Sequence, residues 1–113
     1  MSTVKEFGYR KPRFQADFSL WVQTDEPQVR ALSAHCFDIG EDGIGAELTE
    51  PLNIGQKVRF VFTLPRANCS WHVAAKVINR HENQYGFLFL YGSASEREFI
   101  HDFLIYLQGS TAH

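Results

Sequence analysis

The amino-acid sequence predicts a mostly β protein, a single antiparallel β-barrel of about six strands with one C-terminal α-helix. Two observations lead to this prediction. Apolar and polar residues alternate with a period of two from Phe14 to Tyr91, which is the period of half-buried strands. After Ser93 the apolar residues follow the period of a helix. A closed barrel is preferred to a sandwich because closure removes unpaired strand edges.

Three strand-like runs make up the first half of the chain. The first covers residues 14–22, and the polar stretch 25–28 separates it from a return strand predicted over 29–38. A short third strand is predicted over 44–48, after a tight turn that the glycines at 40, 43 and 45 allow. The predicted core residues of the first two runs are Ala16, Phe18, Leu20, Val22, Leu32, Ala34 and Cys36.

Three further runs make up the second half of the barrel. One covers residues 57–64 and is stopped by Pro65. The next covers 70–80, and a turn at 81–84 leads to the last strand at 85–91. The predicted core residues here are Val58, Phe60, Phe62, Leu64, Trp71, Val73, Ala75 and Val77.

The helix has both start and stop signals. Residues 93–98 contain two overlapping capping boxes, Ser93 with Glu96 and Ser95 with Glu98. Gly109 is expected to end the helix. Apolar residues at helical spacing form one stripe that can pack on the barrel mouth or on a partner, namely Phe99, Ile100, Phe103, Leu104 and Leu107.

The two tryptophans receive different predictions. Trp21 falls on the polar face of the first strand, and we expect it to pack beneath the helix because large aromatic side chains are usually buried. The alternatives for Trp21 are a partner surface and stacking on a base. Trp71 alternates with apolar residues and is expected in the core.

Length and composition limit the class of protein. The 113 residues are expected to form one domain, with a leader at 1–13 that carries an arginine motif, a barrel and helix at 14–109, and a tail at 110–113. The net charge of −2 gives no global basic field, so nucleic acid is not an expected partner. The chain has neither a signal-like apolar segment nor an apolar run approaching the ~18 residues of a membrane span. We therefore expect a cytoplasmic protein without membrane insertion.

Neither an enzyme nor a metal site is expected. The five histidines and two cysteines lack the spacing of metal ligands. Phosphate-binding glycine loops and nucleophile elbows are also absent from the sequence. Cys36 and Cys69 fall in different strand-like runs and are expected to be buried thiols.

Two short motifs point to a ligand. Arg10-Lys11-Pro12-Arg13 precedes the first run, and Asp38-Ile39-Gly40-Glu41-Asp42-Gly43 ends the second, with Asp38 25 positions after Arg13. That interval accommodates a strand, a turn and a return strand, so the fold can bring the motifs together. Guanidinium groups bind phosphate and stack on bases, and a carboxylate accepts from guanine N–H groups. Taken singly, the motifs have simpler readings, as solvated arginines and as an Asx-type turn. Taken together, they favour a ligand with phosphates and a purine edge.

The motif pair resembles the PilZ domain, a bacterial receptor module for cyclic di-GMP. The signature of that family is an Arg-x-x-x-Arg leader followed by Asp/Asn-x-Ser-x-x-Gly. Later runs at 52–58, 73–77 and 85–89 follow the order of the family's strands, so the resemblance covers about residues 7–107. The chain departs from the signature twice, because its arginines are spaced Arg-x-x-Arg and Gly40 stands at the serine position.

The resemblance implies a cyclic di-GMP receptor, with the ligand bound as the intercalated dimer that the family often uses. Arg10 and Arg13 would clamp phosphate and stack on guanine, and Asp38 would accept from a guanine edge. Gly43 would permit close backbone approach, and Gly40 would offer its backbone N–H.

Three functional hypotheses remain open at this stage. In the first, ligand binding orders the leader across the barrel mouth and changes a surface that an unidentified protein effector reads. In the second, the domain is a PilZ-like interaction module that does not bind cyclic di-GMP. In the third, the barrel is unrelated to the family. A homodimer is compatible with each hypothesis if part of the helix stripe is exposed.

Overall fold

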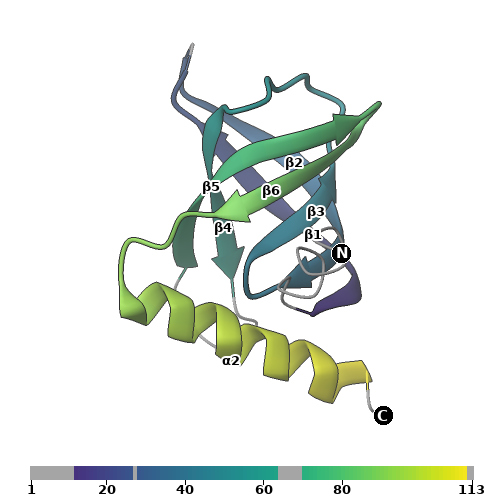
Figure 1. Ribbon diagram of the computed structural model, residues 1–113, viewed down its shortest axis with the longest axis vertical. Helices are drawn as coiled ribbons and strands as arrows, with labels where there is room; N and C mark the ends of the chain where they lie inside the picture. Colours follow the sequence, from purple (N-terminus) through teal and green to yellow (C-terminus); the bar gives the residue numbers. More distant parts are fainter. Residues whose placement is uncertain (1–11, 27, 64–69, 112–113) are drawn as a thin grey trace, which may run out of the picture.

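Six strands close into one barrel. The computed structural model describes residues 12–26, 28–63 and 70–111. Every strand pair is antiparallel, and the order around the barrel is β1-β2-β3-β6-β5-β4 (Figure 1). The predicted fold class is therefore confirmed. The elements are β1 (Arg13–Thr24), β2 (Arg30–Gly40), β3 (Gly43–Glu47), β4 (Lys57–Thr63), β5 (Ser70–His81), β6 (Gln84–Phe89) and α2 (Ala94–Thr111).

Strand β1 closes the barrel because it pairs on both sides. Its register with β2 runs from Arg13 opposite Gly40 to Thr24 opposite Arg30, with an irregularity between Gln15 and Phe18. On its other side, only residues 21–24 pair with β4. The first half of β1 therefore continues along the end of β2 alone, past the last pair with β4.

Period-two alternation directs the predicted core residues into the barrel. Phe60 and Phe87 lie at its centre, with ring centroids 4.8 Å apart in an edge-to-face arrangement. The Tyr85 hydroxyl is also buried, and it accepts a hydrogen bond from the backbone N–H of Leu52 at 3.1 Å. Predicted core residues that are buried are Leu20, Val22, Leu32, Ala34, Cys36, Val58, Phe60, Phe62, Val73, Ala75 and Val77. Leu64 and Cys69 lie outside the described residues.

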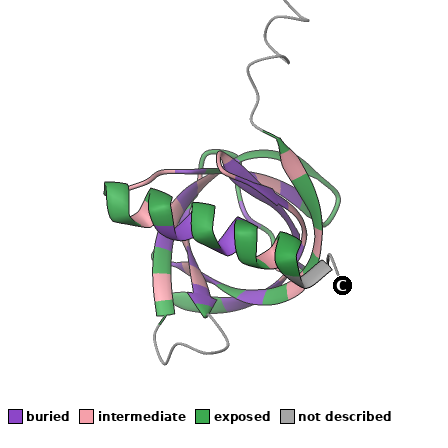
Figure 2. Cartoon of the chain, turned by 90° about the horizontal axis from the view of Figure 1, so that it is seen from below, coloured by how far each residue is buried: buried purple, intermediate pink, exposed green. Residues whose placement is uncertain are grey.

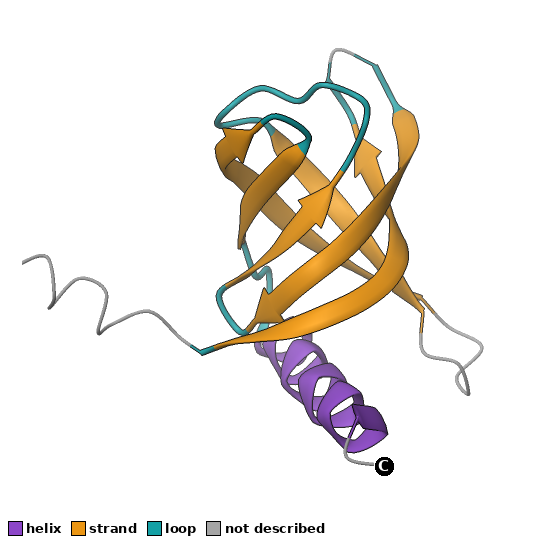
Figure 3. Ribbon diagram, turned by 90° about the vertical axis from the view of Figure 1, so that its right-hand side faces the viewer, coloured by secondary structure: helices purple, strands orange, loops and turns teal. Residues whose placement is uncertain are grey.

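Helix α2 lies across one mouth of the barrel (Figure 2). Its inner stripe is buried against the strand ends, so the barrel mouth is the surface that the stripe covers. Phe62 of β4 joins the two layers, with its ring centroid 5.7 Å from that of Phe99 and 5.3 Å from that of Phe103. Figure 3 shows the tilted strands ending above the helix. In the described part of the chain, no helix has the length and apolar character needed to cross a membrane.

The tryptophan that packs beneath the helix is Trp71, and the prediction for Trp21 is wrong. Trp71 stacks on Phe99 with ring centroids 5.0 Å apart and an interplanar angle of 11°. Trp21 is 55% exposed on the outside of the barrel. The strand alternation explains this difference, because Trp21 lies between Val61 and Ser33 on the outer face of the barrel.

The helix and strand ends differ slightly from the predicted bounds. Of the two capping boxes, the first begins the helix, because the Ser93 hydroxyl accepts from the N–H of Glu96 at 3.2 Å. Gly109 does not end the helix, which continues to Thr111. Arg13, assigned above to the leader, is the first residue of β1. Gly43 likewise belongs to β3 instead of preceding it.

Phe62→Ala is expected to lower the free energy of unfolding by about 3–5 kcal/mol, because it leaves a cavity between the barrel and α2. Urea unfolding followed by circular dichroism measures this change. Ile54→Ala is the control, since Ile54 is 61% exposed and its removal should change stability by no more than about 0.5 kcal/mol. Equal stability of the two variants would contradict tight packing between the helix and the barrel.

Candidate functional site

The two sequence motifs meet on the outer surface of the barrel. Arg13 begins β1 and lies opposite Gly40 at the end of β2. Its Nη1 donates to Oδ1 of Asp38 at 2.9 Å, so strand pairing brings these two residues together as the sequence interval allows. Arg10, the other predicted arginine, lies outside the described residues.

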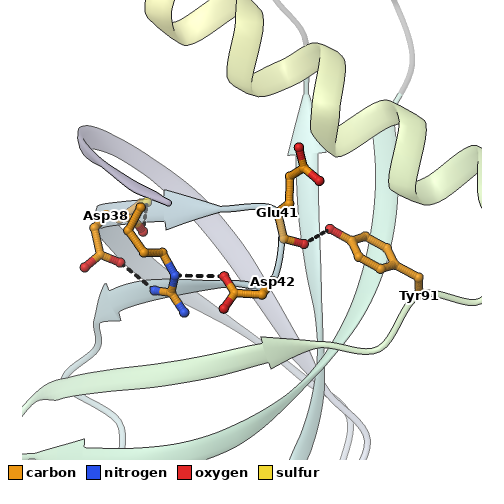
Figure 4. Close-up of polar contacts among 6 residues, drawn as sticks. Asp38, Glu41, Asp42 and Tyr91 are labelled. Carbon is orange, nitrogen blue, oxygen red and sulfur yellow. Dashed lines mark hydrogen bonds and ion pairs between the residues drawn. The ribbon is translucent and has the colours of Figure 1, made fainter. Parts of the chain in front are cut away.

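Arg13 is held by two carboxylates (Figure 4). Besides its bond to Asp38, its Nε donates to Oδ1 of Asp42 at 3.0 Å. The side chains are partly exposed, 21% for Arg13, 34% for Asp38 and 26% for Asp42. Ion pairs of this exposure contribute roughly 0–1 kcal/mol each, so both can be exchanged for contacts with a ligand. The guanidinium group is thus held in place, and two of its nitrogen atoms already donate to carboxylates of the protein.

Asp38 is oriented by an irregularity in β2. The register with β3 shifts between Cys36 and Asp38, which places Asp38 opposite Gly45. The Cys36 thiol donates to the backbone carbonyl oxygen of Asp38 at 3.2 Å. Burial, with a smaller contribution from the Asp38 carboxylate, raises the pKa of Cys36 to about 12. The thiol therefore stays protonated and supports Asp38 from inside the barrel.

Gly40 and Gly43 are required by close packing, because neither has a positive φ. A Cβ at Gly40 would collide with the backbone carbonyl oxygen of Pro12 and lie 2.9 Å from Cδ of Arg13. A serine there would therefore require β1 to shift at its start. A Cβ at Gly43 would collide with the carbonyl oxygen of Phe87 and lie 3.0 Å from Nη2 of Arg13. The two glycines let β1 and β6 approach the turn between β2 and β3.

A shallow depression of about 200 Å³ lies beside Arg13 and Asp38. Its floor includes Gly45 and Gly86, which are cross-strand partners on β3 and β6. A Cβ at Gly86 would lie 2.5 Å from Oδ1 of Asn79, so the side chain of Asn79 covers that part of the floor. Sites that enclose a small molecule usually measure about 300–1,000 Å³. A molecule larger than this volume would therefore lie on the surface, with much of its area uncovered by the described residues.

The turn between β2 and β3 connects the site to α2. Asp42 contacts Arg13, while its neighbour Glu41 accepts a hydrogen bond at its carbonyl oxygen from the Tyr91 hydroxyl (Figure 4). The Glu41 carboxylate lies 3.2 Å from Nδ1 of His101 on the helix. One residue of this turn thus contacts Arg13, and its neighbour contacts the helix that covers the barrel mouth.

Sequence reasoning identified part of this arrangement. Of its five site residues, Arg13, Asp38, Gly40 and Gly43 lie together. It missed Asp42, although that residue stands inside the quoted motif and an acid in a turn opposite an arginine is a usable signal. Asn79 and Gly86 carried no signal, because their position depends on β6 lying beside both β3 and β5. Among the described residues, no group of three His, Cys, Asp or Glu is placed to hold a metal ion.

Gly43→Ala is expected to lower the free energy of unfolding by about 2 kcal/mol or more, because the added methyl group meets a backbone carbonyl that cannot rotate away. Thermal and urea unfolding measure the change. Gly109→Ala is the matched control, because it adds the same methyl group in a helix with nothing within 4 Å. That control should be neutral or stabilising by up to about 1 kcal/mol. A harmless Gly43→Ala would show that β3 and β6 tolerate a wider separation.

Tyr91→Phe is expected to destabilise the protein by about 1 kcal/mol at neutral pH, since it removes the hydrogen bond to Glu41. Burial raises the pKa of Tyr91 from its ordinary 10.0 to about 12. Between these pH values the phenol ionises in the unfolded state only, so the contribution of Tyr91 is lost as pH rises from 10 to 12. Urea unfolding across this pH range should show the difference between wild type and variant shrinking. Tyr106→Phe, at an exposed position, controls for general alkaline unfolding.

Comparison with known proteins agrees with this architecture. The sequence profile of the PilZ domain matches residues 9–106. The PilZ domain of CeSA from a cellulose-synthesizing bacterium superposes with a TM-score of 0.73 at 13% identity, covering 86% of this chain and 98% of that chain. The PilZ domain with c-di-GMP of YcgR from Escherichia coli gives 0.69 at 18% identity, covering 90% and 92%.

Longer proteins contain a similar domain. The inhibitor of motility MotI/DgrA of Bacillus subtilis gives a TM-score of 0.60 at 17% identity, covering 92% of this chain and 53% of that chain. No curated protein matches the sequence. The profile match spans most of the chain, and the closed six-strand barrel with its C-terminal helix agrees with it. The chain therefore belongs to the PilZ domain family.

Proposed function

We propose that this chain is a cytoplasmic receptor for cyclic di-GMP that signals to a protein partner and is not an enzyme. One observation carries the proposal. Arg13 and Asp38, from motifs 25 positions apart, are hydrogen-bonded at 2.9 Å beside a depression floored by glycine. The similar PilZ domain of YcgR is described with c-di-GMP.

Ligand binding at this site is an exchange of partners for Arg13. The guanidinium would leave Asp38 and Asp42 to clamp a phosphate and stack on a guanine, with Arg10 joining it from the leader. Asp38 would then accept from the guanine N–H groups, while Gly40 and Gly43 would act indirectly, by letting β1 and β6 approach the turn that carries these side chains. The open surface around the 200 Å³ depression is compatible with an intercalated dimer of the ligand, which a closed pocket of this size would exclude.

The contacts of the turn between β2 and β3 provide a way for ligand binding to change the surface near α2. When Arg13 leaves Asp42, the turn loses one of its side-chain restraints, while Glu41 remains bonded to Tyr91 and His101. A shift in the turn is thereby transmitted to the position of α2 on the barrel mouth. The partner would read the changed surface near the helix.

A second candidate is an interaction module that does not bind the nucleotide. Two observations favour it, since Gly40 lacks the serine hydroxyl of the family signature and Arg13 is already neutralised by two carboxylates. A lost hydrogen bond to a ligand weakens binding by roughly 0.5–3 kcal/mol.

Calorimetric titration with cyclic di-GMP tests the receptor, with cyclic di-AMP and GTP as controls. Saturable binding of cyclic di-GMP alone is expected, and Arg10→Ala/Arg13→Ala should abolish it with the circular dichroism spectrum unchanged. Arg30→Ala is the matched control, because Arg30 is an arginine paired with a carboxylate, Glu50, away from the site. If high ligand concentrations give no heat of binding and no shift in melting temperature, the receptor proposal is wrong and the interaction module becomes the favoured function.

Asp42→Asn in the same titration tests the exchange of partners. The variant should bind cyclic di-GMP about twofold to fivefold more tightly, because breaking a partly exposed ion pair costs up to roughly 1 kcal/mol. Glu50→Gln, which removes the carboxylate paired with Arg30, should leave the affinity unchanged. Weaker binding by Asp42→Asn would mean that Asp42 positions Arg13 for the ligand instead of competing with it.

A further inference from the structure

One wall of the barrel carries only positive charge. Strands β6, β5 and β4 are neighbours, and all of their residues are described. None of these residues is Asp or Glu, although the whole chain has a net charge of −2. The Lys and Arg residues of the wall are Lys57, Arg59, Lys76 and Arg80.

Two of these cations lie directly opposite each other on neighbouring strands. Lys57 on β4 lies directly opposite Lys76 on β5, and like charges in that position repel. Among the described residues, no carboxylate forms an ion pair with either ammonium group. Arg59 differs from them, because its Nη2 lies 2.9 Å from both carboxylate oxygens of Asp25. Arg80 also forms no ion pair with a described carboxylate, and its Nε donates to the backbone carbonyl oxygen of Glu82 at 2.8 Å. Lys57 and Lys76 are the unpaired cations of the wall that lie directly opposite each other.

An exposed tryptophan lies further along the same outer surface. Trp21 is 55% exposed, and its neighbour across the β1–β4 pair is Val61, which lies opposite His72 on β5 and four positions along β4 from Lys57. Exposed tryptophan is typical of residues that dominate protein interfaces. We call Trp21, Lys57, Val61, His72 and Lys76 the basic face.

Helix α2 has an exposed outer side (Figure 2), and this side carries acidic and apolar residues. Glu98, Asp102 and Ile105 recur at helical spacing, so they share one side of the helix. Ile105 is 55% exposed and its neighbour Tyr106 is 45% exposed. Glu98 and Asp102 are like charges four positions apart, and neither forms an ion pair with another described residue. We call Glu98, Asp102, Ile105 and Tyr106 the acidic helix face.

We propose that the basic face of one copy of this chain binds the acidic helix face of a second copy. The contact pairs two repelling lysines with two repelling carboxylates and covers Trp21 with Ile105 and Tyr106. Both faces thereby lose an internal repulsion and an exposed apolar patch. A second copy is favoured over nucleic acid because its helix supplies apolar groups for Trp21 as well as carboxylates for the lysines.

The position of α2 favours a two-fold dimer. Its residues Phe99 and Phe103 contact Phe62 on β4, and Phe99 also stacks on Trp71 of β5, so the helix adjoins the strands of the basic face. In a dimer with two-fold symmetry each copy offers both faces, and the contact is made twice. This inference concerns self-association in the absence of nucleotide and does not rest on the proposed receptor function.

Sedimentation equilibrium with charge-reversed chains tests the dimer. Wild type should self-associate reversibly, and more weakly as salt is raised. Lys57→Glu/Lys76→Glu and Glu98→Lys/Asp102→Lys should each weaken self-association by at least about tenfold. An equal mixture of the two variants should associate again, because each variant carries the face that complements the other. Merely misfolded variants would not recover on mixing.

A substitution of Trp21 tests the apolar part of the proposed contact. Trp21→Ala should weaken self-association about tenfold, whereas Ile54→Ala, which removes an exposed residue outside both faces, should leave it unchanged. A wild type that stays monomeric at millimolar concentration would overturn the proposal, and the basic face would then be open to an acidic protein or to nucleic acid. A mixture of reversed variants that stays monomeric would overturn it equally.

Discussion

Barrel closure by β1 is the constraint on which the candidate site depends. Only the last four residues of β1, 21–24, pair with β4, and this pairing fixes the tilt of the strand. Its other end must then run along the end of β2, which sets Arg13 opposite Gly40 and within reach of Asp38. The close approach at Gly40 and Gly43 follows from the same geometry, since β1 and β6 press against one turn from two sides. A site made of three chain segments thus has its position determined by the backbone pairing of β1 with β2 and of β3 with β6.

Much of the fold could be predicted from the sequence, because a closed barrel buries one face of every strand and leaves a period of two in the residues. The same rule explains the error over Trp21, whose place in the alternation indicated the outer face more reliably than its size indicated burial. The order of the strands could not be predicted, since nothing local says that β6 lies between β3 and β5. Residues defined by that order, such as Asn79 and Gly86, were therefore missed. Asp42 was missed for a different reason, because the resemblance assigned no role to its position.

The structure also changes the meaning of Gly40. In the sequence, glycine at this position removes the serine hydroxyl of the family signature, which counts against ligand binding. In the fold it is the residue that the backbone of Pro12 and the side chain of Arg13 cover, so a larger residue would move the arginine that the site requires. The glycine that departs from the family signature is therefore also the residue that makes room for Arg13.

The double ion pair of Arg13 has a consequence for selectivity among cellular anions. An anion that draws the guanidinium away leaves Asp38 and Asp42 with their cation removed, and both carboxylates belong to one small surface. Inorganic phosphate supplies a new partner for the arginine but no hydrogen-bond donor for the abandoned carboxylates. A ligand that combines an anionic group with N–H donors compensates both sides of the exchange. Under the proposed exchange, inorganic phosphate and phosphate esters without N–H donors would therefore be poor competitors, even though the arginine itself has no preference among anions.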